Sequence, residues 1–264
     1  MRLLTFTLIL AGSLIAADFS TRYDVDVGMF GKVGYADITL KEDSGHYEMR
    51  LVARTTGTAA SLTGDRVETY ISKGQRKAGK YIPDSFVKIK KTNQKERIQT
   101  YLFDHEAKTI TLSEETDEWI NGTTFDPITF KLVKTSTKDH SSSESTLQTY
   151  NEDDVLSAYL NTKQSCNAKK KEHHLLAVGA HNDKKDITLS FLDGLQKTKA
   201  EASFSDDIGN VYELHVKPID KKDESIDVLI AFDNDGHMKE AVLGDVFWIG
   251  EIKARRVYHH VSSR

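Results

Sequence analysis

Residues 33–53, VGYADITLKEDSGHYEMRLVA, decide the fold of this chain, together with the preceding YDVDV at residues 23–27. Apolar and polar side chains alternate in both stretches, and an extended strand would send the two sets to opposite faces. Within the longer stretch, Asp43-Ser44-Gly45 is a turn signal. The pattern therefore predicts half-buried strands, two of which are joined as a hairpin.

Short β-rich runs recur along the rest of the chain. They are separated by clusters of Gly, Asn, Asp or Lys, and Asp233-Asn234-Asp235-Gly236 is the clearest turn. Further strands are predicted over residues 66–72, 85–91, 97–103, 109–112, 175–180, 186–191, 197–204, 211–216, 226–232, 238–243, 246–249 and 253–258. We therefore expect a mainly β fold, an antiparallel sheet curved into a barrel or half-barrel with one or two short helices.

Two segments interrupt the strand pattern. Residues 135–145 are too polar to bury, which predicts a mobile polar loop near residues 135–152. Just after it, Asp153 or Asp154 can cap a short helix with one apolar stripe, which we expect to plug the sheet. Its stripe consists of Val155, Leu156, Tyr159 and Leu160. A second, weaker helix is predicted over residues 59–66, where Gly64 and threonines lower the propensity.

The first 17 residues predict export. Arg2 precedes an apolar run that ends in Ala16 and Ala17, the pattern of a secretory signal peptide and one too short for a membrane anchor. No cysteine follows the run, so we expect no lipid anchor. We therefore expect a periplasmic or secreted protein, soluble after removal of residues 1–17, with residues 18–264 forming a single β-rich domain of two halves.

Composition excludes several classes of partner and of stabilisation. The 264 residues carry a net charge of −4 with both signs intermixed, so no single-sign field would attract nucleic acid. Cys166 is the only cysteine and cannot form an intramolecular disulfide. The fold must therefore depend on burial of apolar side chains.

Histidines near Cys166 raise the question of a metal site. Imidazole and thiolate are zinc ligands, and Glu172-His173-His174 and His181 lie near Cys166 in the sequence. Adjacent residues of a strand point to opposite faces, so His173 and His174 would not hold one metal, and the same objection applies to His259 and His260. The turn at residues 233–236 also lacks the further ligands of a calcium loop. We expect solvated side chains here and predict no metal site.

Nucleophilic and cofactor chemistry find no better support. Ser157 lacks the glycines of a nucleophile elbow, which favours the polar face of a helix, and Cys166 lacks the signatures of a thiol enzyme. Asp104-His105-Glu106 reads as a turn, and Gly28, Gly31 and Gly34 do not open a helix as dinucleotide binding requires. We therefore predict no catalytic residue and no cofactor, and the sequence identifies no ligand-binding residue.

Two lysine clusters complete the charged features. They comprise Lys88, Lys90 and Lys91, and residues 169–171. We interpret both as solvated faces, with contact to an anionic envelope polymer as the alternative.

Several motifs resemble one family of exported proteins. These are Val33-Gly34-Tyr35-Ala36, the run ARTTG at residues 53–57, Tyr81-Ile82-Pro83 and, most specifically, DVLSAYL at residues 154–160. They resemble bacterial envelope proteins of domain-of-unknown-function family 3108 over most of the chain that follows the leader. The resemblance implies an exported β-rich fold, a sheet wrapped about a short helix, and no established activity. The Ser-rich segment before the helix and the Lys-rich segment after it depart from the family pattern.

Three functions remain open. We favour a non-catalytic envelope protein that binds or carries an apolar or envelope-derived ligand, because curved sheets leave apolar grooves. The alternative is an assembly factor that docks a protein partner on an exposed sheet edge, and a hydrolase of envelope polymer is the third. The expected partner is a lipid or another envelope component. We expect no nucleic acid and no transmembrane segment in the mature chain, and the oligomeric state stays open.

Overall fold

The structure is a computed structural model that describes residues 17–167, 171–179, 187–205, 209–216, 226–244 and 250–263. The predicted leader, apart from its last residue, and the strand predicted over residues 246–249 lie outside the described residues. His181 and the lysines at positions 169 and 170 lie outside them as well.

One antiparallel sheet of 14 strands dominates the described residues. Its first-half strands are β1 (Ala17–Val27), β2 (Gly31–Asp43), β3 (His46–Thr55), β4 (Val67–Lys77), β5 (Lys80–Lys91), β6 (Lys95–Asp104), β7 (Thr109–Asp126) and β8 (Lys131–Thr146). Its second-half strands are β10 (Glu172–Leu175), β12 (Ile187–Phe191), β13 (Asn210–Val216), β14 (Ile226–Phe232), β15 (Met238–Leu243) and β16 (Ile252–Ser263). Two short strands, β9 (Asp153–Asp154) and β11 (Ala177–Val178), pair in parallel outside this sheet.

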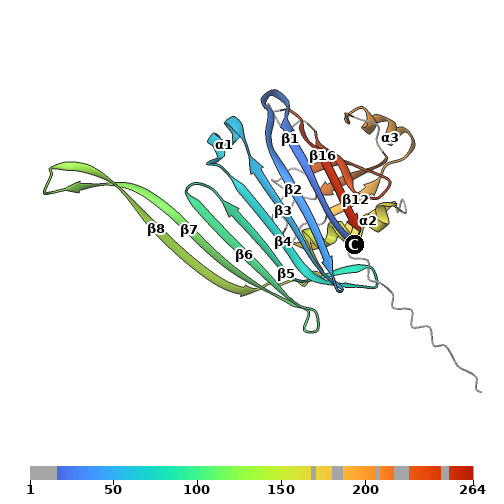
Figure 1. Cartoon of the computed structure of the whole chain (residues 1–264), viewed down its shortest axis with the longest axis horizontal. Coiled ribbons are helices and arrows are strands. Elements are labelled where there is room, and N and C mark those ends of the chain that lie inside the picture. Colours follow the sequence, from blue (N-terminus) through green and yellow to red (C-terminus); the bar gives the residue numbers. More distant parts are fainter. Residues whose placement is uncertain are drawn as a thin grey trace, which may run out of the picture.

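The two halves meet in the middle of the sheet. Strand β16 pairs with β1, so the order runs β10-β12-β13-β14-β15-β16-β1-β2-β3-β4-β5-β6-β7-β8. Strands β10 and β8 end the sheet, which therefore does not close, and Figure 1 shows β8 far from the second-half strands. The prediction of a mainly β chain with a curved antiparallel sheet is confirmed, in its half-barrel form.

In the described part of the chain, three helices accompany the sheet: α1 (Gly57–Thr63), α2 (Val155–Asn167) and α3 (Gly194–Glu201). A short 3-10 turn (Gly28–Phe30) also links β1 to β2. Helix α2 contacts β4 and β5 and also packs near β12, β13 and β14, so the sheet curves around it. The two predicted helices are thus present as α1 and α2. No helix among the described residues is long and apolar enough to cross a membrane.

The main core lies between α2 and the first-half strands. Leu156 and Leu160 of α2 pack with buried side chains of the sheet, among them Tyr47 and Met49, which alternate along β3 as predicted. A second cluster centres on Leu189, Tyr212 and Phe232 of the second half, and a third lies under α3. Period-two burial on the sheet and helical spacing on α2 therefore build the core together.

Several predictions about secondary structure are wrong. The strand expected over residues 175–180 is divided, since β10 ends at Leu175 and β11 covers only Ala177 and Val178, which pair with β9 in a separate sheet. The polar loop expected from Thr135 is strand β8, which pairs with β7 although every one of its side chains is exposed. The pairing uses backbone groups, which do not require an apolar face. The strand expected over residues 197–204 is helix α3, whose Leu, Gln, Lys, Ala and Glu are good helix formers. In addition, the strand predicted over residues 109–112 is longer than expected, since β7 extends from Thr109 to Asp126.

Candidate ligand-binding site

Helix α2 starts at a buried carboxylate. Asp154 Oδ1 accepts hydrogen bonds from the backbone N–H groups of Leu156 (2.7 Å) and Ser157 (3.1 Å). In return, Ser157 Oγ accepts from the Asp154 N–H at 2.9 Å. This reciprocal pair is a capping box. Ser157 is completely buried, so its expected place on a polar helix face is wrong, and its hydroxyl serves the cap.

The cap is tied to the sheet by a serine far away in the sequence. Ser72 Oγ on β4 donates to Asp154 Oδ2 at 2.6 Å and also lies 2.9 Å from the Tyr47 hydroxyl. Burial raises the pKa of Asp154 to about 6, against the opposing effect of these hydrogen bonds. Asp154 is completely buried and does not line the cavity described below, so its role is to fix α2 in place.

A second polar contact fixes the middle of α2. Asn161 pairs with the backbone of Tyr81 on β5, accepting from its N–H at 2.8 Å and donating to its C=O at 2.9 Å. The same amide donates to Asp153 at 2.9 Å. Because both the start and the middle of α2 are held by specific bonds to the first-half strands, the opposite face of the helix is presented to the second half.

An apolar cavity of about 210 Å³ lies between that face of α2 and the second half of the sheet. The helix contributes positions spaced by three or four residues, and β12 and β14 contribute positions spaced by two, so each element shows one face to the cavity. The cavity is lined by Val155, Ala158, Tyr159, Thr162, Leu175, Ala177, Ile187, Leu189, Leu214, Ile230 and Phe232.

The polar atoms of this lining are already bonded. Thr162 Oγ1 donates to the Ala158 carbonyl within the helix at 2.7 Å, which leaves its methyl group for the cavity. The Tyr159 hydroxyl accepts from the Met238 N–H at 3.3 Å. A cavity of about 150 Å³ with such a lining holds benzene, and drug-sized ligands need roughly 300 Å³ or more. The cavity therefore suits one small apolar group or part of a longer chain.

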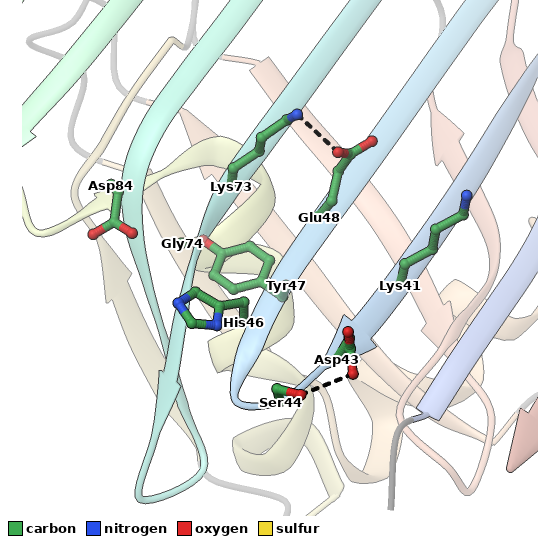
Figure 2. A pocket seen from close by; sticks show the side chains of 9 residues that line it. All are labelled: Lys41, Asp43, Ser44, His46, Tyr47, Glu48, Lys73, Gly74 and Asp84. Carbon is green, nitrogen blue, oxygen red and sulfur yellow. Dashed lines mark hydrogen bonds and ion pairs between the residues drawn. The ribbon is translucent and has the colours of Figure 1, made fainter. Parts of the chain in front are cut away.

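A larger hollow, lined mainly by polar and charged residues, lies on the surface at the end of strands β2 to β5. Its volume is about 530 Å³, and Figure 2 shows that its side chains come from neighbouring strands, with Lys73 linked to Glu48 and Ser44 to Asp43. The ion pair between Lys73 and Glu48 (2.9 Å) bridges two strands, and Ser44 bonds to its neighbour Asp43. The backbone of Gly74 approaches β5 so closely that a Cβ would lie 2.0 Å from the Ile82 oxygen. The lining of this hollow is mostly exposed and charged, and the hollow lies where the register of β4 and β5 shifts between Lys73 and Gly74. We therefore place the candidate site at the apolar cavity.

The described histidines near Cys166, His173 and His174, lie on opposite faces of β10. His173 is buried on β10 while the neighbouring His174 is exposed beside Glu172 at 3.3 Å, so adjacent residues face opposite sides as predicted. The expectation that both are solvated is thus wrong for His173. Cys166 belongs to α2, and its side chain is outside what the structure describes. Within the described ranges, no three His, Cys, Asp or Glu side chains gather as a metal site would require.

A pair of histidines that the sequence did not single out together lies under β1. The rings of His237 and His259 have centroids 4.6 Å apart, and His237 also packs edge-on to Phe19 at 4.9 Å. His237 follows the predicted turn at residues 233–236, which is confirmed, and the Asp233 carboxylate accepts its N–H. Although partial burial opposes ionisation, Arg256 at 2.7 Å holds the pKa of Asp233 below its usual range. Phe19, His237 and His259 are far apart in the sequence, so no local pattern predicts that they come together.

The other residues considered as candidates for chemistry or for charged contacts stabilise the fold or lie on its surface. His105 lies in the predicted turn and links the Tyr150 hydroxyl (2.6 Å) to the Pro83 carbonyl (2.8 Å). The prediction of a solvated face is wrong for Lys88, which is buried and donates to the Gly179 carbonyl at 2.9 Å. Lys91 is exposed as expected and pairs with Glu96 at 3.4 Å.

The motifs quoted for the family resemblance also have clear structural roles. Gly34 lies where β2 crowds β3, since a Cβ there would be 2.4 Å from the Arg54 carbonyl oxygen. Gly57 opens α1 with a φ of 59°, which favours glycine. The segment DVLSAYL contains the capping box and one side of the cavity lining. These residues shape the fold around α2.

The comparisons with known proteins concern structure and sequence separately. Among solved structures, the chain is similar to the crystal structure of a beta-barrel-like protein of domain of unknown function DUF1849 from Brucella abortus, with 14% identity, coverage of 93% of this chain and 98% of that chain, and a TM-score of 0.46. None of the curated proteins matches the chain. A family model described as protein of unknown function (DUF3108) matches residues 22–254. The chain therefore belongs to the DUF3108 family of proteins of unknown function.

Proposed function

We propose that this protein is an exported, non-catalytic binding or carrier protein of the cell envelope, which holds an apolar group of its ligand in the cavity beside α2. The observation that carries the proposal is the cavity of about 210 Å³, whose lining is apolar and whose polar atoms are already hydrogen-bonded. Such a space favours hydrocarbon over water, because water would find no free partners there. The sequence of residues 1–17 supports export.

The ligand class follows from the size and chemistry of the cavity. About 210 Å³ accepts a short length of acyl chain or a small ring, and the rest of a lipid would extend outside. The lining offers no charged side chain, so recognition depends on apolar contact and shape. An envelope lipid with one chain inserted fits these requirements.

The test is to fill the cavity and measure ligand binding. In the Ala158→Leu and Ala158→Phe variants, the added side chains project from α2 into the lining, and overpacking costs about 1–3 kcal/mol of stability. We expect the lipid recovered with natively purified protein, measured by mass spectrometry, and the affinity for a fluorescent fatty acid to fall in the order wild type, Leu, Phe.

The matched control is Ala202→Phe, which adds the same side chain at an exposed position after α3. It should bind like the wild type. Equal binding by all four proteins, with folding verified by circular dichroism, would contradict the proposal, as would wild-type protein that retains no lipid and binds no fatty acid.

The open sheet favours a second candidate function, an assembly factor of the envelope. Strand β8 ends the sheet, and its outer edge pairs with no described strand. Free strand edges pair readily with an added strand of a partner. This alternative can be tested with photo-crosslinkers placed along β8. Capture of one defined envelope protein, by a chain that binds no lipid, would support the assembly role instead of the carrier role.

A further inference from the structure

Strands β7 and β8 extend beyond the rest of the sheet as a two-stranded arm. The neighbouring strand β6 reaches along β7 only to the pair Lys95–Glu118, whereas β7 and β8 stay paired as far as Asp126 and Lys131. Figure 1 shows this hairpin, in green, projecting away from all other strands. We call residues 119–138 the arm and residues 125–132 its tip.

The tip concentrates apolar side chains in water. Ile128, Phe130 and Leu132 are 89%, 79% and 73% exposed. Phe125 faces Leu132 across the hairpin and packs edge-on to Phe130, with ring centroids 6.0 Å apart. The rest of β8 is rich in Ser, Thr and Lys, so apolar exposure is concentrated where the arm ends. Contiguous exposed apolar side chains of this kind mark an interaction site.

The backbone of the turn is prepared for an apolar surrounding. Pro127 has no N–H, and the Ile128 N–H donates to Asp126 Oδ1 at 2.9 Å. The hydroxyl of Thr129 donates to Asp126 Oδ2 at 2.6 Å. These bonds satisfy groups of the turn that would each cost several kcal/mol in hydrocarbon. The same bonds lower the pKa of Asp126, so its carboxylate stays charged and belongs with Lys131 at the headgroups rather than in the apolar layer.

The charges behind the tip are suited to anionic headgroups. Within residues 121–136, Lys131 and Lys134 face a single acid, Asp126, which lies directly across the hairpin from Lys131. Lys134 lies three residues behind Lys131, about 10 Å along the strand. Interfacial segments insert by roughly 5–10 Å, and a long lysine side chain reaches back toward water, so Lys131 beside the inserted tip and Lys134 behind it both bring their ammonium groups to headgroup level.

We propose that the tip of the β7–β8 arm inserts into the surface of a lipid bilayer that carries anionic headgroups, with Ile128, Phe130 and Leu132 in the apolar layer and Lys131 and Lys134 at the headgroups. A protein interface typically uses about 20–30 residues a side, and the tip is only two strands wide. A lipid surface requires no matching shape. The inference goes beyond the proposed function, because docking of the arm does not depend on what fills the cavity beside α2.

The experiment is flotation of the full chain without its leader with vesicles of phosphatidylcholine alone or of phosphatidylcholine with phosphatidylglycerol. We expect binding to the anionic vesicles, weakened about tenfold or more by the double variant Ile128→Asp, Phe130→Ser. The variant Lys131→Gln, Lys134→Gln should bind several-fold more weakly, and salt of about 0.5 M should weaken the wild type in the same way. The matched control is Leu62→Asp, which changes an equally exposed leucine on α1 and should bind like the wild type.

A reporter at the tip distinguishes insertion from adsorption. Tryptophan introduced by Phe130→Trp should shift its emission to the blue with anionic vesicles and should be quenched by brominated acyl chains. Absence of flotation by the wild type, equal flotation by the folded double variant, or a reporter that is not quenched would each overturn the proposal. Crosslinking of a protein to position 130 without any vesicle binding would assign the tip to a protein partner instead and overturn it as well.

Discussion

Strand β7 passes through two environments, and the contrast between them explains how this molecule is organised. At its start, Ile110 is completely buried and packs in the core that α2 completes. Beyond Glu118 the same strand pairs with β8 alone, and nearly all of its side chains are exposed. The backbone hydrogen bonds between β7 and β8 thus continue into a region where the side chains are no longer buried. Hydrogen bonding is therefore sufficient to extend a strand from an existing sheet, whereas the stability of the sheet depends on the buried region around α2.

The largest effect should come from comparing one phenylalanine in each region. Phe86 is completely buried between the rings of Tyr70 and Tyr101, so Phe86→Ala should lower the free energy of unfolding by about 3–5 kcal/mol. Phe125 of the arm is 53% exposed, and Phe125→Ala should change the free energy of unfolding by about 0.5 kcal/mol or less. Urea unfolding of both variants measures the difference. Similar losses in the two would mean that the arm is packed in solution.

The next effect concerns the buried cap of α2 and depends on pH. Burial raises the pKa of Asp154 from 3.8 to about 6 in the folded protein. Between these values the folded state holds more protons than the unfolded state, so the contribution of this group to stability falls as pH rises through that window. A shift of this size corresponds to about 3 kcal/mol.

The Asp154→Asn variant lacks this titration and serves as the reference. The free energy of unfolding of the wild type minus that of the variant should fall by about 3 kcal/mol between about pH 4 and pH 6.5 and be flat above. Chemical unfolding at several pH values provides the measurement. A difference that does not change with pH would show that water reaches Asp154 and that the cap is open.

The same contrast shows which parts of the fold the sequence could predict. Tyr47 and Met49 alternate with polar residues because one face of β3 is buried, so the sequence shows an apolar residue at every second position. Strand β8 has no buried face and hence no period to detect. Helix α3 buries only Ala200 among its residues, so its apolar pattern is too weak to distinguish a helix from a strand.

The candidate site was predictable only in part. The stripe on residues 155–160 and its cap at Asp153 or Asp154 could be predicted, because both are local. The contacts that place the helix are not local, since Ser72 precedes Asp154 by 82 residues and Tyr81 precedes Asn161 by 80. The cavity also needs Leu189 and Leu214 to face α2 across the curved sheet, which no single strand pattern reveals.

Even removal of the whole arm should have only a small effect on stability. Glu118 and Asp139 face each other across β7 and β8, so residues 119–138 can be replaced by Asn-Gly, which closes two antiparallel strands in a tight turn. We expect the free energy of unfolding to change by about 1 kcal/mol or less, because the deleted side chains are nearly all exposed. Fatty-acid binding should persist and flotation with anionic vesicles should be lost. A loss of stability comparable to that of Phe86→Ala would contradict the division, because it would show that the arm and the region around α2 unfold as one unit.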